Sequence, residues 1–508
     1  DALRLALLDR LPGYMVPLAF MRLAALPLTS HGKLDRRALP DPELADLTAT
    51  AYEAPQGENE VIIAGLWEQV LGLERVGRHD NFFELGGHSL LAVSLVERMR
   101  NAGLSADVRV LLGQPTVAAL AASVGNGREI VVPDNNVPTG CTRITPDMLS
   151  LTRLDQAAID RVVSTVLGGA ANVQEIYPLA PLQEGILYHN LTAEQDDPYL
   201  LQLRLNFDSI ARLQSVAAGL RKVIARHDSL RTAVIWEGLE APQQVVWRRA
   251  ELSVEEVSDL AHLAPMDLGR APLIRLDYNR DLSRESISAT LLFHHIVVDA
   301  TALEVMREEL LTHLRGEPET TLPAVPYRNY VAQARLGVSE AEHEAYFREQ
   351  LGDIDEPTLP FGLRDVQGNV QGDGRCIEEH QHTLPDELMH RLRRQARQLG
   401  VSVASLFHLA WGRVLGAATG NDRVVFGTVL LGRLQGGAGA DRGMGMFINT
   451  LPVRVDLDEV SVRDGARATH ARLATLLGHE HASLAQAQRF SGVGTASPLF
   501  SAILNYRH

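Results

Sequence analysis

The chain has 508 residues, of which 45% are apolar, and this length exceeds what one ordinary hydrophobic core organises. It therefore predicts a multidomain globular protein of three or four units. The formal net charge of −15 argues against a nucleic-acid partner, because binding to phosphates depends on clustered Lys and Arg. The sequence also lacks an uncharged apolar run of about 18 residues, so we expect no membrane partner.

Only two cysteines occur, Cys141 and Cys376, and they lack the spacing of a zinc or redox site. Such sparse use of cysteine is typical of a reducing compartment, so we expect a cytoplasmic protein. The first residues do not have the basic-then-apolar layout of a signal peptide, and the chain does not begin with Met. We therefore expect residue 1 to be a boundary inside a longer polypeptide.

The N-terminal part divides by its pattern into short units. Residues 1–40 end in LPLTSHGKLDRRALP and are expected to be a compact module, whereas residues 41–57 have no periodic pattern and are predicted to be a linker. Helical periodicity begins near Glu58, and further helices are predicted over 90–99 and 116–124. Residues 58–125 are thus predicted to form a small helical bundle, followed by a Gly-, Pro- and Asn-containing linker over 126–140.

The string DNFFELGGHSL places Ser89 after paired glycines, at the start of a predicted helix. The N-terminus of a helix favours an incoming phosphate through its dipole and its free N–H groups, which suits formation of a phosphodiester at Ser89. For an isolated Gly-Gly-x-Ser, a serine that caps the helix is the better explanation. A nucleophile-elbow hydrolase is a poor alternative. Its G-x-S-x-G motif requires a glycine two residues after the serine, and Leu91 occupies that position here.

A large α/β region is predicted over 141–508, and it contains the string FHHIVVDA at 293–300. Alternation along a strand places His294 and His295 on opposite faces, so only one of the two rings can point into a given channel. For the same reason tandem histidines are poor metal ligands, and no acidic residue has zincin spacing. The sequence therefore predicts no metal site.

Together these strings resemble the motifs of nonribosomal peptide synthetases. Residues 80–90 resemble the signature of thiolation (peptidyl carrier) domains, which are four-helix bundles whose serine, here Ser89, receives 4′-phosphopantetheine from coenzyme A by a phosphopantetheinyl transferase. Residues 293–300 resemble the His-His-x-x-x-Asp-Gly motif of condensation domains, which are α/β proteins of two chloramphenicol acetyltransferase-like lobes. The remaining strings occur in the family order, at 177–185, 327–330, 427–433 and 445–452.

Residues 11–40 resemble the C-terminal end of an adenylation domain, and Lys33 matches the lysine that contacts the adenylate. The remainder of that enzyme is missing, so we expect no amino-acid activation by this chain. By the same resemblance, the condensation domain covers 141–508, with a first lobe that extends to about residue 330 and an incomplete second lobe.

The resemblance implies that His295 lies where two substrate tunnels meet, and that His294 is a packed imidazole beside it. Asp299 is expected to have a structural role, because a buried aspartate needs a counter-charge. The string RHDSLRT at 226–232 resembles the family motif whose arginine provides that charge, and we favour Arg231 over Arg226. The candidate catalytic residues are therefore His295, His294 and Asp299, and the candidate supporting residues are Arg231, Arg226 and Asn449.

Two positions depart from the family pattern. Ala300 replaces the motif glycine, and if that position requires a positive φ, its Cβ costs on the order of 1 kcal/mol. Residues 187–199 resemble the extended motif of dual epimerisation/condensation domains, but Asn190 replaces its second histidine and Asp196 replaces its glycine. Because asparagine cannot shuttle a proton at neutral pH, we expect condensation without epimerisation.

The reaction implied by the resemblance is transfer of an acyl group from a carrier thioester to an amine, which forms an amide. An α-amine with a pKa near ~7.7 is partly neutral at cytoplasmic pH, so His295 either accepts a proton or orients the amine. The carrier precedes the condensation domain and is therefore expected to be the donor, with an upstream adenylation domain and a downstream acceptor carrier as partners. Two alternatives stay open: a non-catalytic docking platform, and an acyltransferase for a small soluble amine.

Overall fold

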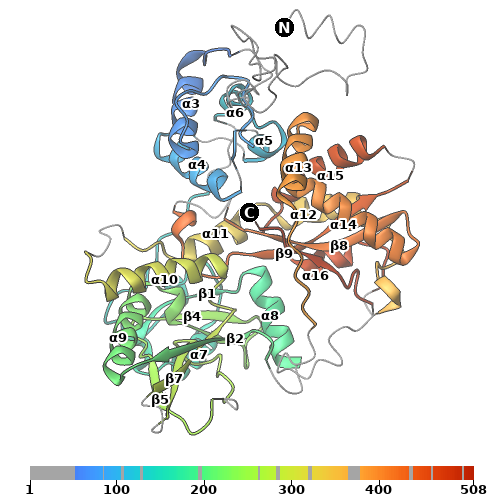
Figure 1. Ribbon diagram of the computed structural model, residues 1–508. Helices are drawn as coiled ribbons and strands as arrows, with labels where there is room; N and C mark the ends of the chain where they lie inside the picture. The colour runs from blue at the N-terminus through green and yellow to red at the C-terminus, as the bar shows by residue number, and fades with distance from the viewer. Residues whose placement is uncertain are drawn as a thin grey trace, which may run out of the picture.

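The protein folds into a helical domain and two α/β lobes (Figure 1). The computed structural model describes residues 52–83, 85–87, 89–104, 108–125, 130–192, 197–260, 264–281, 286–318, 323–363, 378–433, 439–458, 461–494 and 497–507. The predicted adenylation remnant with Lys33, most of the predicted 41–57 linker, and Asp196 lie outside these residues. Among the described helices, none combines the length and the apolar character needed to cross a membrane.

The helical domain contains the four helices that the sequence resemblance implied. They are α3 (Gly57–Leu71), α4 (Ser89–Asn101), α5 (Val108–Gly113) and α6 (Val117–Ala122). Its core is centred on Trp67 of α3, whose ring packs edge-on against Phe82 with the centroids 5.1 Å apart. Helix α6 begins where the Thr116 hydroxyl accepts the N–H of Ala119 at 3.2 Å, as expected for an N-cap.

The first lobe contains two antiparallel-rich sheets and the helices that cover them. Its strands are β1 (Val173–Pro178), β2 (Leu200–Phe207), β3 (Thr232–Ile235), β4 (Gln243–Trp247), β5 (Ser253–Glu256), β6 (Ile274–Asp281) and β7 (Ser286–His294). Its helices are α7 (Gln156–Thr165), α8 (Pro181–Thr192), α9 (Ile210–Arg226), α10 (Ala300–Leu314) and α11 (Arg328–Leu336). The sheet orders are β1-β4-β3 and β2-β7-β6-β5, so β7 is central in its sheet.

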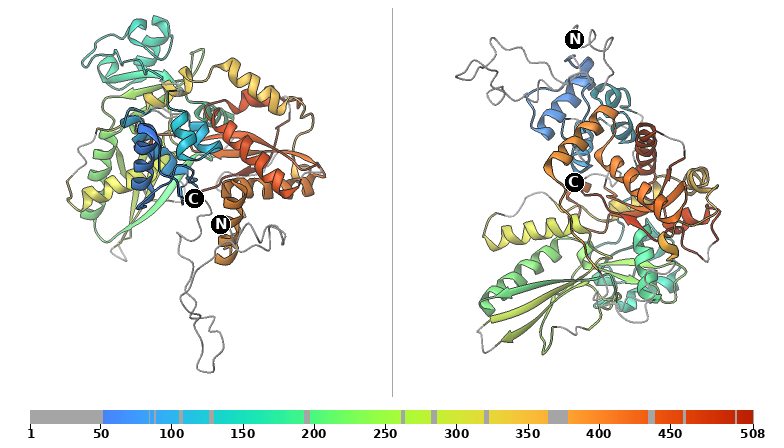
Figure 2. Two further views of the ribbon diagram at one scale, coloured as in Figure 1. Left: turned by 90° about the horizontal axis from the view of Figure 1, so that it is seen from above. Right: turned by 45° about the vertical axis from the view of Figure 1, so that its right-hand side comes forward.

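The second lobe is built on one three-stranded sheet, of order β10-β8-β9. Its strands are β8 (Arg423–Leu430), β9 (Asn449–Asp456) and β10 (Ile503–Leu504), and its helices are α12 (Glu340–Leu351), α13 (Asp386–Leu399), α14 (Val403–Thr419), α15 (Val462–Leu477) and α16 (Leu484–Arg489). Helices α14 and α15 pack against each other and against this sheet. Figures 1 and 2 show the helical domain lying against the orange helices of this lobe.

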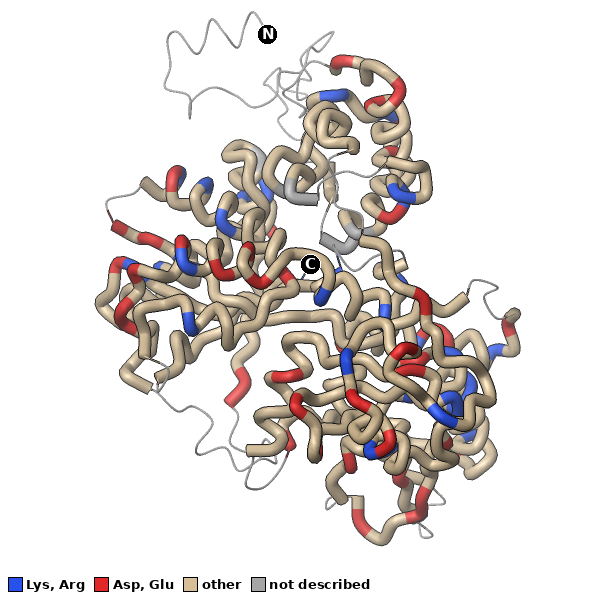
Figure 3. The backbone as a smooth tube through the Cα atoms, turned by 180° about the vertical axis from the view of Figure 1, so that it is seen from behind, with Lys and Arg blue, Asp and Glu red and all other residues tan. Residues whose placement is uncertain are grey.

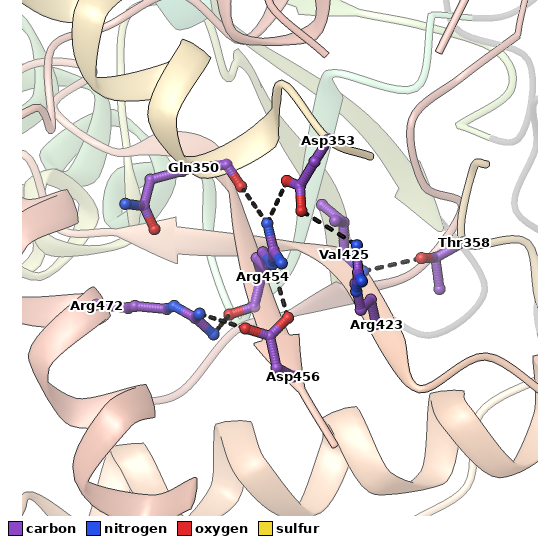
Figure 4. Close-up of polar contacts among 8 residues, drawn as sticks. All are labelled: Gln350, Asp353, Thr358, Arg423, Val425, Arg454, Asp456 and Arg472. Carbon is purple, nitrogen blue, oxygen red and sulfur yellow. Dashed lines mark hydrogen bonds and ion pairs between the residues drawn. The ribbon is translucent and has the colours of Figure 1, made fainter. Parts of the chain in front are cut away.

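Acidic and basic residues are interspersed along the described chain (Figure 3). The second lobe gathers some of them into one network around Arg454 of β9 (Figure 4). Arg454 pairs with Asp353 after α12 and, at 2.7 Å, with Asp456, which also receives Arg472 of α15. The network joins the C-terminal end of β9 to α15 and to the residues that follow α12.

The segment between β8 and β9 crosses to the first lobe, and two glycines allow its path. A Cβ on Gly432, whose φ is +65°, would lie 1.7 Å from the Phe447 carbonyl oxygen. A Cβ on Gly445 would lie 2.3 Å from the Tyr327 ring. Only glycine accommodates both approaches. The Tyr330 hydroxyl then donates to the Phe447 carbonyl at 2.9 Å, which fixes the crossing segment to the first lobe.

A buried ion pair joins β1 to α11 beneath this crossing. Glu175 lies 2.8 Å from Arg328, and both side chains are less than a tenth exposed. Burial raises the pKa of Glu175 to about 7, and the nearby Asp228 adds to this, although the charge of Arg328 opposes it. Glu175 is therefore an acid that the fold holds with its proton more tightly than the unfolded chain does.

This raised pKa predicts how stability depends on pH. In the unfolded chain the carboxyl loses its proton near its ordinary value of 4.5, whereas in the fold it does so near 7, so its contribution is largest below pH 4.5 and declines as pH rises to 7. Relative to Glu175→Gln, the wild type should lose up to roughly 3 kcal/mol of stability between pH 5 and 8. Denaturant unfolding at each pH measures the difference; Glu175→Asp, which still titrates, should retain the slope. A flat difference would contradict the prediction.

Candidate active site

The loop before Ser89 is shaped so that α4 begins at this serine. The Gly87 N–H donates to the Phe82 carbonyl at 2.8 Å, and a Cβ on Gly87 would lie 2.3 Å from the Phe82 ring, so the position requires glycine. Gly86 is exposed and has a φ of +99°, a conformation that favours glycine. The N-terminus of the 13-residue helix that follows favours a phosphate group attached there.

His295 lies just beyond the end of β7, and its ring is partly exposed. Its Nδ1 is 2.7 Å from the Val298 carbonyl oxygen, which can only accept, so Nδ1 carries the proton. In the neutral ring the Nε2 lone pair is then available, and no described residue forms a hydrogen bond with it. The His295 N–H also donates to the Tyr199 carbonyl at 2.9 Å, which holds the backbone. His295 thus presents a fixed acceptor atom.

His294 is fully buried and directed elsewhere. Its Nδ1 accepts the Ile296 N–H at 3.1 Å, so its Nε2 carries the proton and donates to Asp197 at 2.7 Å. Burial raises the pKa of Asp197, but the bonds from His294, Tyr199 and Asn190 outweigh it and hold the pKa below its ordinary value. His294 is therefore a packed imidazole, as the sequence predicted. The strand ends one residue before His295, so the separation of the two rings arises at the turn and not from alternation alone.

The turn after His294 is also held from α8. The Gln183 amide, which is fully buried, donates to the Ile296 carbonyl at 2.7 Å, and its oxygen accepts the Ala180 N–H at 2.8 Å. Because each end of the amide has a partner, the side chain has one orientation. It therefore fixes the position of the Ile296 carbonyl in the loop that presents His295.

Asp299 ends the loop and links the two lobes. Its Oδ1 caps α10 by accepting the Ala302 N–H at 2.8 Å, and its Oδ2 accepts the Phe447 N–H at 3.1 Å. Arg433 approaches both oxygens, at 2.9 and 3.1 Å, and both side chains are fully buried. The Arg433 guanidinium also lies 4.0 Å from the Phe447 ring centroid. In this buried, charge-assisted contact a single guanidinium nitrogen, Nη2, serves both oxygens and holds the two lobes together.

The match to known families decides what this arrangement is. Residues 62–124 match the phosphopantetheine attachment site family, and residues 173–508 match the condensation domain family. The chain belongs to the condensation-domain family. The helical domain is accordingly called the carrier domain below, and 4′-phosphopantetheine is its cofactor. The two-lobed fold expected from the resemblance is confirmed.

Similar proteins agree with this assignment. Malpinin synthetase of Mortierella alpina is 50% identical over 521 residues, which cover 100% of this chain and 7% of the relative. Malpibaldin synthetase of the same organism is 46% identical over 516 residues, which cover 98% and 9%. The chain thus spans less than a tenth of the length of these curated relatives.

A solved structure adds support for the fold alone. A holo four-domain nonribosomal peptide synthetase bound to AMP and glycine has a TM-score of 0.50 at 14% identity, over 66% of this chain and 27% of that chain.

The expected partner of Asp299 was wrong. The condensation domain pairs Asp299 with Arg433, whereas Arg231 donates to the Trp247 carbonyl and, at 3.0 Å, to Gln174. Arg226 lies 3.1 Å from Glu309. Both motif arginines therefore stabilise the first lobe internally, while the counter-charge comes from the crossing segment.

Two other expectations concerned Ala300 and Asn449. Ala300 is the first residue of α10, and Phe361 is the only described non-glycine with a positive φ, so the feared strain at Ala300 does not arise. Asn449 donates to the carbonyls of Glu480 and Ala482, at 2.8 and 2.7 Å. It anchors the start of β9 within the second lobe and does not contact His295.

Sequence reasoning missed three residues that hold the site: Gln183, Asp197 and Arg433. Gln183 and Arg433 belong to the family strings at 177–185 and 427–433, and Asp197 follows the replaced glycine of the 187–199 string. Their presence in those strings was the available signal, but their partners depend on tertiary contacts. Within the described residues, no three His, Cys, Asp or Glu side chains are grouped to hold a metal.

Removal of Arg433 tests the revised pairing. Arg433→Met leaves Asp299 charged and buried, so we expect a loss of about 3–5 kcal/mol in unfolding free energy. Combination with Asp299→Asn should recover part of this loss, because the orphaned charge is gone. Arg231→Met is the control, and its effect should add to that of Asp299→Asn without coupling. A double-mutant cycle by denaturant unfolding measures both; coupling to Arg231 and not to Arg433 would refute the pairing.

Proposed function

We propose that this chain holds an acyl donor on Ser89 of its carrier domain and that its condensation domain joins the acyl group to an amine on a downstream acceptor carrier. The order of the two matched families supports this, since the attachment site precedes the condensation domain. The relatives are named synthetases, which supports a role in nonribosomal peptide synthesis.

One observation carries the catalytic part of the proposal. His295 is partly exposed, and its Nδ1–H is committed to the Val298 carbonyl, so the Nε2 lone pair is available to a substrate. Formation of an amide from a thioester releases one proton from the attacking amine, and Nε2 can accept it or orient the amine by accepting a hydrogen bond. A docking platform would not require one imidazole to be held in this tautomer.

The cofactor supplies a flexible arm that ends in a thiol, on which acyl groups are held as thioesters. The chain's part is to attach that arm at the start of α4, where the helix N-terminus favours the phosphate. A tether also raises the local concentration of donor to roughly millimolar, so the condensation domain need not bind it tightly.

Asp197, His294 and Gln183 organise the loop that presents His295. Asp197 fixes His294, and Gln183 fixes the following carbonyl, so the loop is organised before substrate arrives. Asn190 donates to Asp197 at 2.8 Å and has no titratable proton, which supports the prediction of condensation without epimerisation.

The proposed partners follow from this cycle. A phosphopantetheinyl transferase must load Ser89, an upstream adenylation domain must supply the donor residue, and a downstream carrier must present the acceptor amine.

Loading of the carrier tests the assignment of Ser89. Incubation with coenzyme A and a phosphopantetheinyl transferase should add the mass of one phosphopantetheine to the wild type and none to Ser89→Ala. Intact mass spectrometry measures the gain. Ser94→Ala, on the same helix, is the control and should be loaded fully. An unchanged mass for the wild type, or a full gain in Ser89→Ala, would disprove the assignment.

Replacement of His295 tests the reaction. With loaded donor and acceptor carriers, His295→Ala should form amide at least about 100-fold more slowly in single-turnover assays, because proton acceptance or orientation by Nε2 is lost. His382→Ala, an exposed histidine, is the control. An undiminished rate, or no product from the wild type, would favour a docking platform. A free amine that competes equally with the carrier-bound amine would favour a stand-alone acyltransferase.

A further inference from the structure

The carrier domain rests on a small apolar surface of the second lobe. Ala474 is 8% exposed and belongs to the carrier's own hydrophobic core, and Leu431 and Leu477 pack against that core. Helix α5 of the carrier contacts α15, and Figure 1 shows the carrier beside the orange helices of the second lobe. These three residues, Leu431, Ala474 and Leu477, form what we call the carrier-docking surface.

This surface is continuous in sequence with the residues that hold Asp299. Leu430 belongs to the core of the second lobe, and Leu431 faces the carrier. Gly432 packs tightly against the Phe447 carbonyl, and Arg433 reaches Asp299. Only Gly432 thus separates a carrier contact from the buried ion pair, and its close packing against Phe447 prevents the two from moving independently.

A second route joins the carrier to Arg433. The Arg433 Nη1 donates to the carbonyls of Ala440 and Gly443, at 2.7 and 2.9 Å. The intervening 3₁₀ turn η6 (Ala440–Arg442) lies beside α4, the helix that begins at Ser89. Arg433 is therefore held by a loop that the carrier itself covers.

The docking surface is built for reversible contact. An open pocket of about 570 Å³ lies beside the contact; Gly113 of α5 lines it from the carrier, and the other lining residues, such as Arg467, His470 and Ala471, belong to the second lobe. Incomplete packing forfeits dispersion energy, so this interface is weaker than the interiors of either domain. A carrier that must visit several enzymes needs an interface of this kind.

We infer that docking of the carrier on this surface stabilises the Arg433–Asp299 pair, and so couples carrier position to the loop that presents His295. The coupling runs through residues 430–433 and through η6. Because coupling free energy is reciprocal, loss of the ion pair should also loosen the docked carrier. The inference concerns control of the site and goes beyond the proposed amide-forming activity.

Hydrogen exchange of the full chain, without substrate, tests the inference. Ala474→Glu places a charge in the carrier-docking surface but lies on α15, away from the ion pair in sequence. Three amides report on the pair: Asp299 (to the Gly445 carbonyl), Ala302 and Phe447 (both to the Asp299 carboxylate). We expect their exchange to be at least about 5-fold faster in Ala474→Glu, the lower end of usual coupling. Small-angle scattering reports undocking as a larger radius of gyration.

Two controls separate coupling from damage. Val462→Glu lies on the same helix but is 76% exposed, so exchange and dimensions should match the wild type. Amides that pair β8 with β9, such as those of Val424 and Val455, should remain protected in Ala474→Glu, which shows that the second lobe is intact.

The outcomes are distinct. Undocking with faster exchange at the three amides supports the inference, and Arg433→Met should then also enlarge the radius of gyration. Undocking with unchanged amides overturns it, as does a chain that stays docked despite the buried glutamate. None of these results depends on product formation, so failure here leaves the proposed reaction to be judged separately.

Discussion

The buried pair between Asp299 and Arg433 is the interaction on which the arrangement of this protein depends. Both side chains are fully buried, so neither charge can lose its partner without a large cost. Asp299 also caps α10 and receives the Phe447 N–H, while Arg433 packs on the Phe447 ring. Both carboxylate oxygens of Asp299 thus have partners, and Arg433 links the crossing segment of the second lobe to the start of α10, close to His295 in the sequence.

The candidate site follows from that constraint by a series of satisfied hydrogen bonds. Gln183 comes from α8, Asp197 from the turn before β2, and Val298 from the motif itself, and each holds one atom of the loop. In a buried environment a partner missing from such a network is expensive, so the loop has one conformation. The site supplies one imidazole nitrogen, His295 Nε2, that is oriented before substrate binds. This is enough for a reaction that mainly requires positioning.

The carrier domain uses a contrasting kind of contact. A few apolar residues beside an open pocket contact it along α15, whereas an ion pair and tight glycine packing hold the lobes together. The difference matches the two tasks, since the lobes must keep their geometry and the carrier must leave. The two kinds of contact meet in residues 430–433, where one segment contributes to both.

The sequence by itself determined what depends on neighbouring residues. The glycines before Ser89 and the period of the following residues predicted that α4 begins there, and the order of the short strings predicted a carrier bundle followed by a two-lobed α/β domain. Only the tertiary structure decided the partner of Asp299, because Arg433 is 134 residues away and reaches it through a segment that crosses between lobes. The resemblance to the family motif favoured Arg231, but its guanidinium donates to the Trp247 carbonyl. Likewise Ala300 causes no backbone strain, because Asp299 caps α10 and Ala300 is the first residue of that helix. The sequence did not show this, because Asp299 is held there by residues of the second lobe.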